Sequence, residues 1–245
     1  NRLKTSSVLD VATGSWSGTA WVSASGPLTT SYEYDANGNV VKTTDPNGNV
    51  TWSWYDKVGQ KTHQADAENY LTSWTYDAEG NVLRERRYGN MAAAPSSTSV
   101  PPGVTGDEYK DRITDFTYDK VGNRLSETRL NVEVYKSDGT SELTAAIITY
   151  SYNGLGLVTR KTDATGDFVT YSYDLAGRVG SETRSSYTDQ SGTLVTPTVD
   201  YYYNGLGNLS RTRQLGSANA TARVTQYIYD GDKLARMIDP SGVSR

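Results

Sequence analysis

The stretch "YDANGNVVKTTDPNGNV", residues 34–50, decides the fold. An Asp at the first position of a type I turn can accept a hydrogen bond from the backbone two residues on, and a Gly at the fourth position supplies the positive φ that leads into the next strand. Asp35 to Gly38 and Asp45 to Gly48 both fit this pattern. The stretch therefore predicts the end of a strand, a turn, a second strand and a second turn.

The first half of this phrase recurs along the chain with a base period of 21 residues. In eight copies a Tyr is followed by Asp or Asn, and in seven of them Gly stands four residues after the Tyr; only the copy at Tyr229 moves its Gly. The predicted structural repeat residues are Tyr34, Asp35, Gly38, Tyr55, Asp56, Gly59, Tyr76, Asp77, Gly80, Tyr118, Asp119, Gly122, Tyr152, Gly156, Tyr173, Asp174, Gly177, Tyr203, Gly207, Tyr229 and Asp230. Such a period is the signature of a repeat architecture.

The strands between the turns carry aromatic residues at a fixed offset. Seven of the eight positions that lie two residues before a repeat Tyr are aromatic, and residues two apart share a face of a strand. The exception is Ser53, which lies between Trp52 and Trp54. We interpret this ladder as cross-strand packing that fixes the register, and a platform on which carbohydrate rings stack is the alternative.

No segment has the periodicity of an amphipathic helix, so the fold class is all-β. The predicted architecture is a spiralling antiparallel ribbon of β-hairpin repeats, a curved segment of a β-shell. A closed β-barrel and a propeller are the alternatives. We expect residues 1–27 to be a degenerate or partial repeat and residues 28–245 to be the repeat region, with a long loop at 88–112 and extended hairpins near 130–149 and 185–200.

Composition excludes several classes of protein. The 245 residues have a net charge of -4 and no basic patch, which argues against binding of nucleic acid. No apolar run approaches the roughly 20 residues of a membrane span. Zero Cys excludes disulfides and thiolate chemistry, and 19 Tyr against 2 Phe suit a broad amphipathic sheet. Because the chain starts at Asn1 without Met or a signal peptide, we expect an internal fragment of a longer protein.

No catalytic, cofactor-binding or metal-binding site is predicted. His63 is the only His, so neither a catalytic triad nor a multi-His metal site can be assembled, and a surface strand position is expected. The loops after Asp35 and Asp45 lack the acidic closing ligand of a calcium loop. The Gly-Leu-Gly segments at 154–156 and 205–207 precede no helix and are not phosphate loops.

The phrase Tyr-Asp-x-x-Gly-Asn at 21-residue spacing, with Asp-Pro-Asn-Gly-Asn between copies, closely resembles the YD repeats of bacterial Rhs proteins. Similar repeats occur in the B and C components of insecticidal toxin complexes and in teneurins. The resemblance covers residues 28–245 and implies a ribbon of hairpins that winds into a hollow shell around a toxic polypeptide in bacterial relatives. Asp239-Pro240-Ser241-Gly242 resembles the aspartate element of self-cleavage in Rhs proteins, but an ordinary second turn is the favoured interpretation.

The resemblance implies a non-enzymatic structural segment of an exported bacterial protein, secreted or at the cell surface, that needs no cofactor. The expected partners are the remaining repeats of the full-length protein or other copies of this chain, with an encapsulated toxin and glycans as further candidates. An extracellular adhesion or carbohydrate-binding module is the alternative function. The strands at both ends of such a ribbon have unpaired edges, so isolated fragments are expected to associate.

Overall fold

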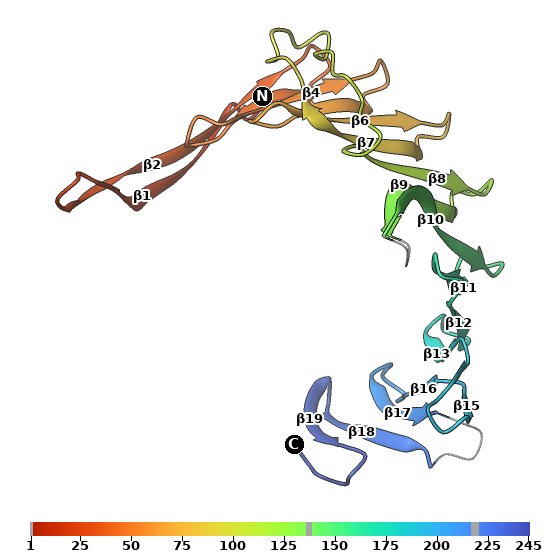
Figure 1. Cartoon of the computed structure of the whole chain (residues 1–245). Helices are drawn as coiled ribbons and strands as arrows, with labels where there is room; N and C mark the ends of the chain where they lie inside the picture. Colours follow the sequence, from red (N-terminus) through yellow and green to blue (C-terminus); the bar gives the residue numbers. More distant parts are fainter. Residues whose placement is uncertain (1, 136–138, 217–220) are drawn as a thin grey trace. The chain divides into compact units, whose positions relative to one another are not determined.

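The computed structural model describes residues 2–135, 139–216 and 221–245, and these residues form strands and turns without a helix (Figure 1). The strands are β1 (Thr5–Trp16), β2 (Trp21–Tyr34), β3 (Val40–Thr44), β4 (Val50–Tyr55), β5 (Lys61–Ala65), β6 (Tyr70–Tyr76), β7 (Val82–Met91), β8 (Arg112–Tyr118), β9 (Arg124–Tyr135), β10 (Ser141–Tyr152), β11 (Val158–Thr162), β12 (Phe168–Tyr173), β13 (Val179–Arg184), β14 (Tyr187–Thr188), β15 (Leu194–Val195), β16 (Thr198–Tyr203), β17 (Leu209–Leu215), β18 (Arg223–Asp230) and β19 (Lys233–Ile238). None of the described residues forms a long apolar helix of the kind that crosses a membrane.

Seventeen of the strands belong to one antiparallel sheet in which each strand pairs with the next along the chain. β13 pairs with β16, and the two short strands between them pair with each other. Within the described residues no pairing joins β1 to β19, so the sheet is open. The predicted all-β ribbon of antiparallel hairpins is confirmed, and the alternatives of a closed barrel and a propeller are wrong.

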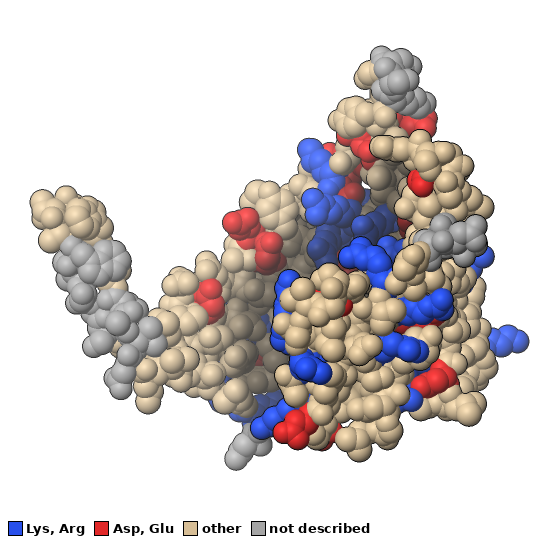
Figure 2. All heavy atoms as spheres, turned by 90° about the horizontal axis from the view of Figure 1, so that it is seen from below, with Lys and Arg blue, Asp and Glu red and all other residues tan. Residues whose placement is uncertain are grey.

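The chain divides into two compact units. Unit 1 comprises residues 1–116 and 128–145, and unit 2 comprises residues 117–127 and 146–245. All buried apolar residues in the described part of the chain lie in unit 1. Unit 2 keeps its aromatic and aliphatic side chains half-buried or exposed, as expected for a single sheet layer. Figure 2 shows basic and acidic side chains interspersed with uncharged ones on the face it displays.

The 21-residue period is interrupted where strands are longer than in the other repeats and at one irregular segment. β1 and β2 form one long hairpin over residues 5–34. β7 continues to Met91 and β8 begins at Arg112, so the irregular segment spans residues 92–111. β9 and β10 pair with each other in the region predicted as an extended hairpin, and residues 136–138 between them lie outside the described residues. The insertion at 185–197 contains the hairpin of β14 and β15, which turns at residues 189–192.

The irregular segment 92–111 covers one face of β4 to β7 in unit 1. Trp54, Ala65, Leu71 and Ala92 form the buried cluster, and Trp52, Tyr88 and Val104 pack against it. The Trp54 indole N–H donates to the carbonyl of residue 97 at 3.1 Å. Trp52 and Trp54 stack at a centroid distance of 6.4 Å. Ser53 alternates with these two rings, which therefore lie on the face opposite the side chain of Tyr55.

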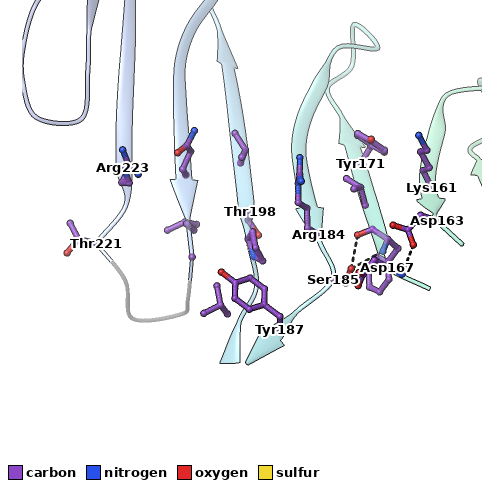
Figure 3. Close-up of a pocket in the computed structure, with 18 residues that line it drawn as sticks. Lys161, Asp163, Asp167, Tyr171, Arg184, Ser185, Tyr187, Thr198, Thr221 and Arg223 are labelled. Carbon is purple, nitrogen blue, oxygen red and sulfur yellow. Dashed lines mark hydrogen bonds between the residues drawn. The ribbon is translucent and has the colours of Figure 1, made fainter. Parts of the chain in front are cut away.

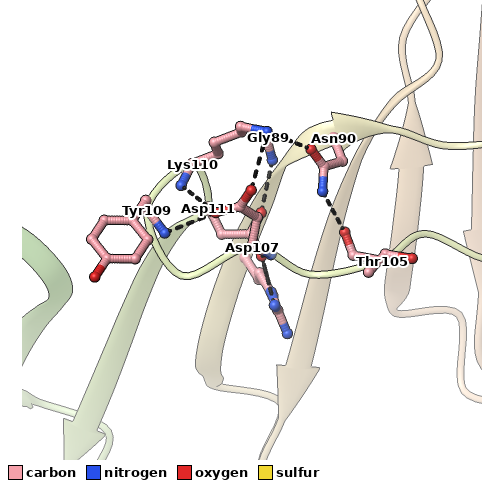
Figure 4. A network of polar contacts seen from close by, with 8 residues as sticks. Gly89, Asn90, Thr105, Asp107, Tyr109, Lys110 and Asp111 are labelled. Carbon is pink, nitrogen blue, oxygen red and sulfur yellow. Dashed lines mark hydrogen bonds and ion pairs between the residues drawn. The ribbon is translucent and has the colours of Figure 1, made fainter.

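A buried carboxylate anchors the end of this segment (Figure 4). The Asp111 side chain is fully buried and accepts hydrogen bonds from the Arg86 guanidinium, with Nη2 at 2.6 Å, and from the backbone N–H groups of Gly89 and Asp107. Burial raises the pKa of Asp111, but the hydrogen bonds from Gly89, Arg86 and Asp107 outweigh it, and the net pKa is below the usual range. Asp111 therefore stays ionised and ties the segment to β7.

We predict that Asp111→Ala lowers the free energy of unfolding of unit 1 by about 3 kcal/mol, because it leaves a half-buried guanidinium and two N–H groups without their acceptor. Asp115→Ala is the matched control, since Asp115 pairs with Arg84 at 2.5 Å in an exposed position. The control should cost less than about 1 kcal/mol. Urea unfolding followed by tryptophan fluorescence measures both variants, and equal losses would contradict the anchoring role.

Candidate functional site

The turn that follows each repeat Tyr is held by the side chain of its first residue. In the first copy the Gly38 N–H donates to the Asp35 carbonyl at 3.2 Å, and the Asp35 N–H donates to the Asn39 carbonyl at 3.0 Å. Asp35 Oδ1 also accepts from the N–H groups of Gly38 at 2.7 Å and Asn39 at 2.8 Å. Gly38 has a φ of 100°, which a residue with a side chain adopts only with strain.

Most of the other repeats build a similar turn, in which the first side chain accepts from the backbone N–H groups two and four residues on. Asp56 accepts from Val58 and Gln60, and Asn153 accepts from Leu155 and Leu157. The same arrangement is present at Asp119, Asp174 and Asn204 and at the second turns that begin with Asp45, Asp66, Asp163, Asp189 and Asp239. Asp239 thus occupies an ordinary second turn, and its carboxylate is hydrogen-bonded within it.

Hydrogen bonding keeps most of these carboxylates ionised. The side-chain amide of the residue four positions on lowers the pKa of Asp35, Asp77 and Asp119, and Arg178 lowers that of Asp174. Because the pKa is lower in the folded chain than in the unfolded chain, ionisation stabilises the fold at pH values above the ordinary value of about 3.9. This contribution is lost as the pH falls through the folded-state pKa.

The hydroxyl of the repeat Tyr forms a bond to the preceding repeat. Tyr55 Oη donates to the carbonyl of Val40 at 3.0 Å, and Val40 lies six residues after Tyr34, the previous repeat Tyr. The same bond joins Tyr76 to Lys61 at 2.7 Å, Tyr152 to Arg124 at 2.7 Å, Tyr173 to Val158 at 2.6 Å and Tyr203 to Val179 at 3.0 Å. Each acceptor stands six residues after a repeat Tyr. The Tyr hydroxyl is therefore a link between successive repeats.

A bulge in the sheet places the acceptor carbonyl. Tyr34 pairs with Val40, whereas Glu33 pairs with Lys42, so Val41 is an extra residue in β3. The pairing of β3 with β4 begins only at Lys42. The carbonyl of Val40 thus lies beyond the end of that ladder, and the Tyr55 hydroxyl occupies the place of a backbone donor. Similar register shifts occur beside Tyr55, Tyr76, Tyr152, Tyr173, Tyr203 and Tyr229.

Burial of the ring supports this donor role. It raises the pKa of the hydroxyl groups of Tyr55, Tyr76, Tyr152 and Tyr173 above the usual value, so these groups stay protonated. The protonated hydroxyl donates to the carbonyl and leaves no buried carbonyl oxygen unpaired at that point.

A second contact joins the turns along the same edge of the sheet. In five repeats the residue five positions after the repeat Tyr lies against the turn Gly of the next repeat. A Cβ atom built on Gly207 would be 3.4 Å from Arg178 Nη1, and one on Gly80 would be 3.2 Å from Gln60 Nε2. The Arg178 guanidinium also lies 4.4 Å from the centroid of the Tyr203 ring. The turn Gly therefore permits the positive φ of the turn and leaves room for the side chain that approaches from the preceding repeat.

Arg2 and Leu3 make the contacts that, in the other repeats, are made by the residues five and six positions after the preceding repeat Tyr. The carbonyl of Leu3 accepts the Tyr34 hydroxyl at 2.5 Å. The guanidinium of Arg2 donates to the carbonyl of Asp35 at 2.9 Å and lies 5.8 Å from the Tyr34 ring centroid. The first residues of the chain thus dock onto the first complete turn in the same way as a preceding repeat.

The last copy departs from the pattern, as its displaced Gly indicates. Asp230 pairs directly with Lys233, and Gly231 has a φ of 60°, so this hairpin closes with a two-residue loop.

His63 lies half-buried in β5, paired with Trp54 and Ser73, and burial lowers its pKa. Among the described residues no group of His, Cys, Asp and Glu is arranged to hold a metal ion.

The sequence identified the repeat tyrosines as structural repeat residues but did not indicate their hydroxyl bonds. The bond joins residues 15 positions apart in three of the links described above, but 28 and 24 apart where insertions intervene. The available signal was the constant use of Tyr rather than Phe at this position. Tyr has a hydroxyl that can donate a hydrogen bond and Phe does not, which accounts for the use of Tyr.

Comparison with known proteins agrees with this geometry. The family model of the RHS repeat matches residues 19–50 and 152–191. No curated protein sequence matched the chain. Crystal structures of TcdB2-TccC3-Cdc42 and of TcdB2-TccC3 without the hypervariable C-terminal region both align with a TM-score of 0.57 and 19% identity, over 87% and 89% of this chain.

The chain spans 10% of the length of each of these two proteins. At this level of identity the structural likeness concerns the fold. The matched repeat and the shared fold define the class, a sheet of β-hairpin repeats, and the resemblance seen in the sequence is confirmed. The chain carries Rhs repeats at the two matched segments, in agreement with the resemblance to the Rhs/YD-repeat family.

We predict that Tyr173→Phe lowers the free energy of unfolding by about 1 kcal/mol, because it removes the bond to Val158 and leaves that carbonyl unpaired. Tyr171→Phe is the matched control on the same face of β12 and should cost less than about 0.5 kcal/mol. Chemical denaturation followed by circular dichroism measures both. A loss for the control as large as for Tyr173→Phe would refute the link.

We predict that Gly177→Val lowers the free energy of unfolding by about 1 kcal/mol or more, since Gly177 has a φ of 77° and a β-branched residue resists that conformation. The same substitution at Gly59, with a φ of 87°, should have a similar effect. Gly205→Ala serves as the control, because no atom lies within 4 Å of its built Cβ and its φ is not in the left-handed region. An unchanged urea midpoint for Gly177→Val would show that the turn tolerates any residue.

We predict that Asn204→Asp stabilises the chain at pH 7. Asn208 Nδ2 is buried without a hydrogen-bond partner, whereas the equivalent amide of Asn81 donates to Asp77 Oδ2 at 2.9 Å. A second carboxylate oxygen at position 204 would supply the missing acceptor. Asn153→Asp should have little effect, because residue 157 is a Leu. The gain in melting temperature should disappear below about pH 4 as the carboxylate is protonated, and a gain that persists there would contradict its electrostatic origin.

Proposed function

We propose that this chain is a non-enzymatic wall segment of an exported bacterial Rhs/YD-repeat protein, in which a shell of such repeats encapsulates a toxin polypeptide. The observation that carries the proposal is the Tyr hydroxyl link, which couples most repeats to the one before them. A ribbon coupled in this way resists separation of its hairpins without needing a thick hydrophobic core. That property suits a wall one sheet thick.

The edges of the ribbon support the role of a segment within a larger assembly. β1 pairs with β2 and has no strand on its other side within the described residues. An edge strand offers unpaired N–H and C=O groups to another strand. The partners proposed are further repeats of the same protein or other copies of this chain, and the toxin polypeptide is the proposed cargo. The proposed location is secreted or at the cell surface.

The proposed absence of catalysis rests on the role of the carboxylates. The repeat Asp side chains accept hydrogen bonds from backbone N–H groups within their own turns, which gives each a structural reason for its position. We predict that Asp56→Asn changes the free energy of unfolding by less than about 0.5 kcal/mol, because Asn153 and Asn204 already accept the same bonds. Asp56 is the best position for this test, since Asp77 also accepts from the Asn81 amide, a bond that Asn would lose.

Peptidase and glycosidase assays of the same Asp56→Asn variant test the enzymatic alternative. The wild-type chain should show no turnover above buffer. A hydrolytic activity that the wild type has and the normally folded Asp56→Asn variant lacks would contradict the structural role.

A carbohydrate-binding module is the alternative function, and one observation favours it. Unit 2 has an open groove on its sheet face that is lined by Lys161, Arg184, Arg223 and aromatic rings. A shell wall and a glycan site are compatible, because the hairpin links use one edge of the sheet and the groove uses a face.

The decisive experiment is protease protection in the full-length protein that contains this chain. The proposed cargo polypeptide should survive proteinase K under native conditions and be degraded once the shell is unfolded. Cleavage at the exposed residues 98–100 serves as the internal control that the protease is active. Degradation of the cargo at the same rate as this stretch in the native protein would refute encapsulation.

A further inference from the structure

The groove of unit 2 lies beside β11, β12, β13, β16, β17 and β18 and has a volume of about 1240 Å³ (Figure 3). Its floor is a face of the sheet, and the hairpin of β14 and β15 contributes Tyr187 and Val195 to one side. All of its lining residues belong to unit 2. The wall segment as proposed above makes no use of this groove.

Three cationic side chains line the groove without a carboxylate partner among the described residues. Lys161, Arg184 and Arg223 are exposed, and none of them takes part in an ion pair. Lys161 pairs across the sheet with Val169, and Val169 pairs with Arg184, so the two cations lie on one face about 10 Å apart. Elsewhere in the chain Arg84, Arg86, Arg178 and Arg213 each contact an Asp. Asp163 and Asp167 also line the groove, so three cations stand against two carboxylates and the lining keeps a net positive charge on a chain of net charge -4.

Rings and hydrogen-bond acceptors complete the lining. Tyr171 belongs to the floor, and Tyr187 is 55% exposed. Figure 3 shows Asp163 and Asp167 at one side of the groove, near Lys161, while Arg184 and Arg223 come from strands further along the sheet. The ligand that fits this lining carries acidic groups for the cations, hydroxyl donors for the carboxylates and flat faces for the rings.

A peptide fits this surface less well. The strands of the floor pair with their neighbours, so the sheet face offers no row of free N–H and C=O groups to an extended peptide backbone, which peptide recognition by sheets uses at an edge. A peptide on the face would leave its own backbone groups without protein partners. A sugar polymer has no backbone amides, and its hydroxyl groups can keep water in an open groove.

From this charge complementarity we propose that the groove of unit 2 binds an acidic polysaccharide through its carboxylates. Arg184 and Lys161 bind the acidic groups, and Tyr187 packs against a sugar ring. Arg223 extends the cationic row toward β18. The site is independent of the Tyr links, so the proposal stands or falls separately from the shell function.

Isothermal titration of the whole chain with an oligogalacturonate tests the proposal. Arg184→Gln and Lys161→Gln should each weaken binding about tenfold, the size of a lost charge-assisted hydrogen bond. Arg211→Gln is the matched control, since Arg211 lies over the Tyr202 ring on the opposite face of the sheet and should leave affinity unchanged. Melting curves confirm that each variant is folded.

Two further ligands separate the alternatives. The methyl-esterified oligomer keeps the sugar rings without the charge and should bind much more weakly, and affinity for the acid form should fall as salt is added. Polyglutamate should bind more weakly than the oligogalacturonate. The proposal is overturned if wild type does not bind the oligogalacturonate, if Arg211→Gln weakens binding as much as Arg184→Gln, or if polyglutamate competes with equal affinity.

Discussion

The hydrogen bond from the repeat Tyr hydroxyl to the carbonyl of the preceding repeat is the interaction on which the ribbon depends. A sheet one layer thick buries little apolar surface, so hydrophobic burial alone gives its hairpins limited stability. Beside each bulge the regular ladder of backbone hydrogen bonds ends early. The Tyr hydroxyl then donates to the carbonyl that the ladder leaves unpaired, as Tyr173 does to Val158. The side chain five residues after the Tyr then packs against the next turn, as Arg178 does at Gly207. Two short-range contacts thus recur at most of the turns.

The two units show two ways of stabilising such a sheet. In unit 1 the irregular segment 92–111 covers Trp54 and Leu71, and the buried Asp111 fixes its end to β7. In unit 2 no buried apolar cluster is present among the described residues, and cross-strand contacts carry more of the stability. Pairs of hydroxyl groups such as Ser172 with Ser181 at 2.8 Å contribute on the exposed face. This thin construction leaves the aromatic face of unit 2 open to a ligand.

The turn residues combine conformational and electrostatic requirements. An Asp at the first position accepts two backbone N–H groups and, where Asn stands four residues later, a side-chain amide as well. Asn at the first position satisfies the backbone but not the amide, which explains the unpaired Nδ2 of Asn208. The preference for Asp is therefore a preference for a second acceptor oxygen. The same hydrogen bonds that hold the turn lower the pKa of the carboxyl.

The sequence by itself determined the class of fold. Turn residues at fixed offsets and a two-residue alternation are local signals, so Asp35, Gly38 and their equivalents were enough to predict antiparallel hairpins and the Rhs/YD resemblance. Only the tertiary structure decided what those hairpins contact. The acceptor of the Tyr hydroxyl, the burial of Asp111 and the placement of Lys161 and Arg184 on one face depend on which strands become neighbours and where a bulge shifts their register. Those are long-range relations that no local pattern encodes.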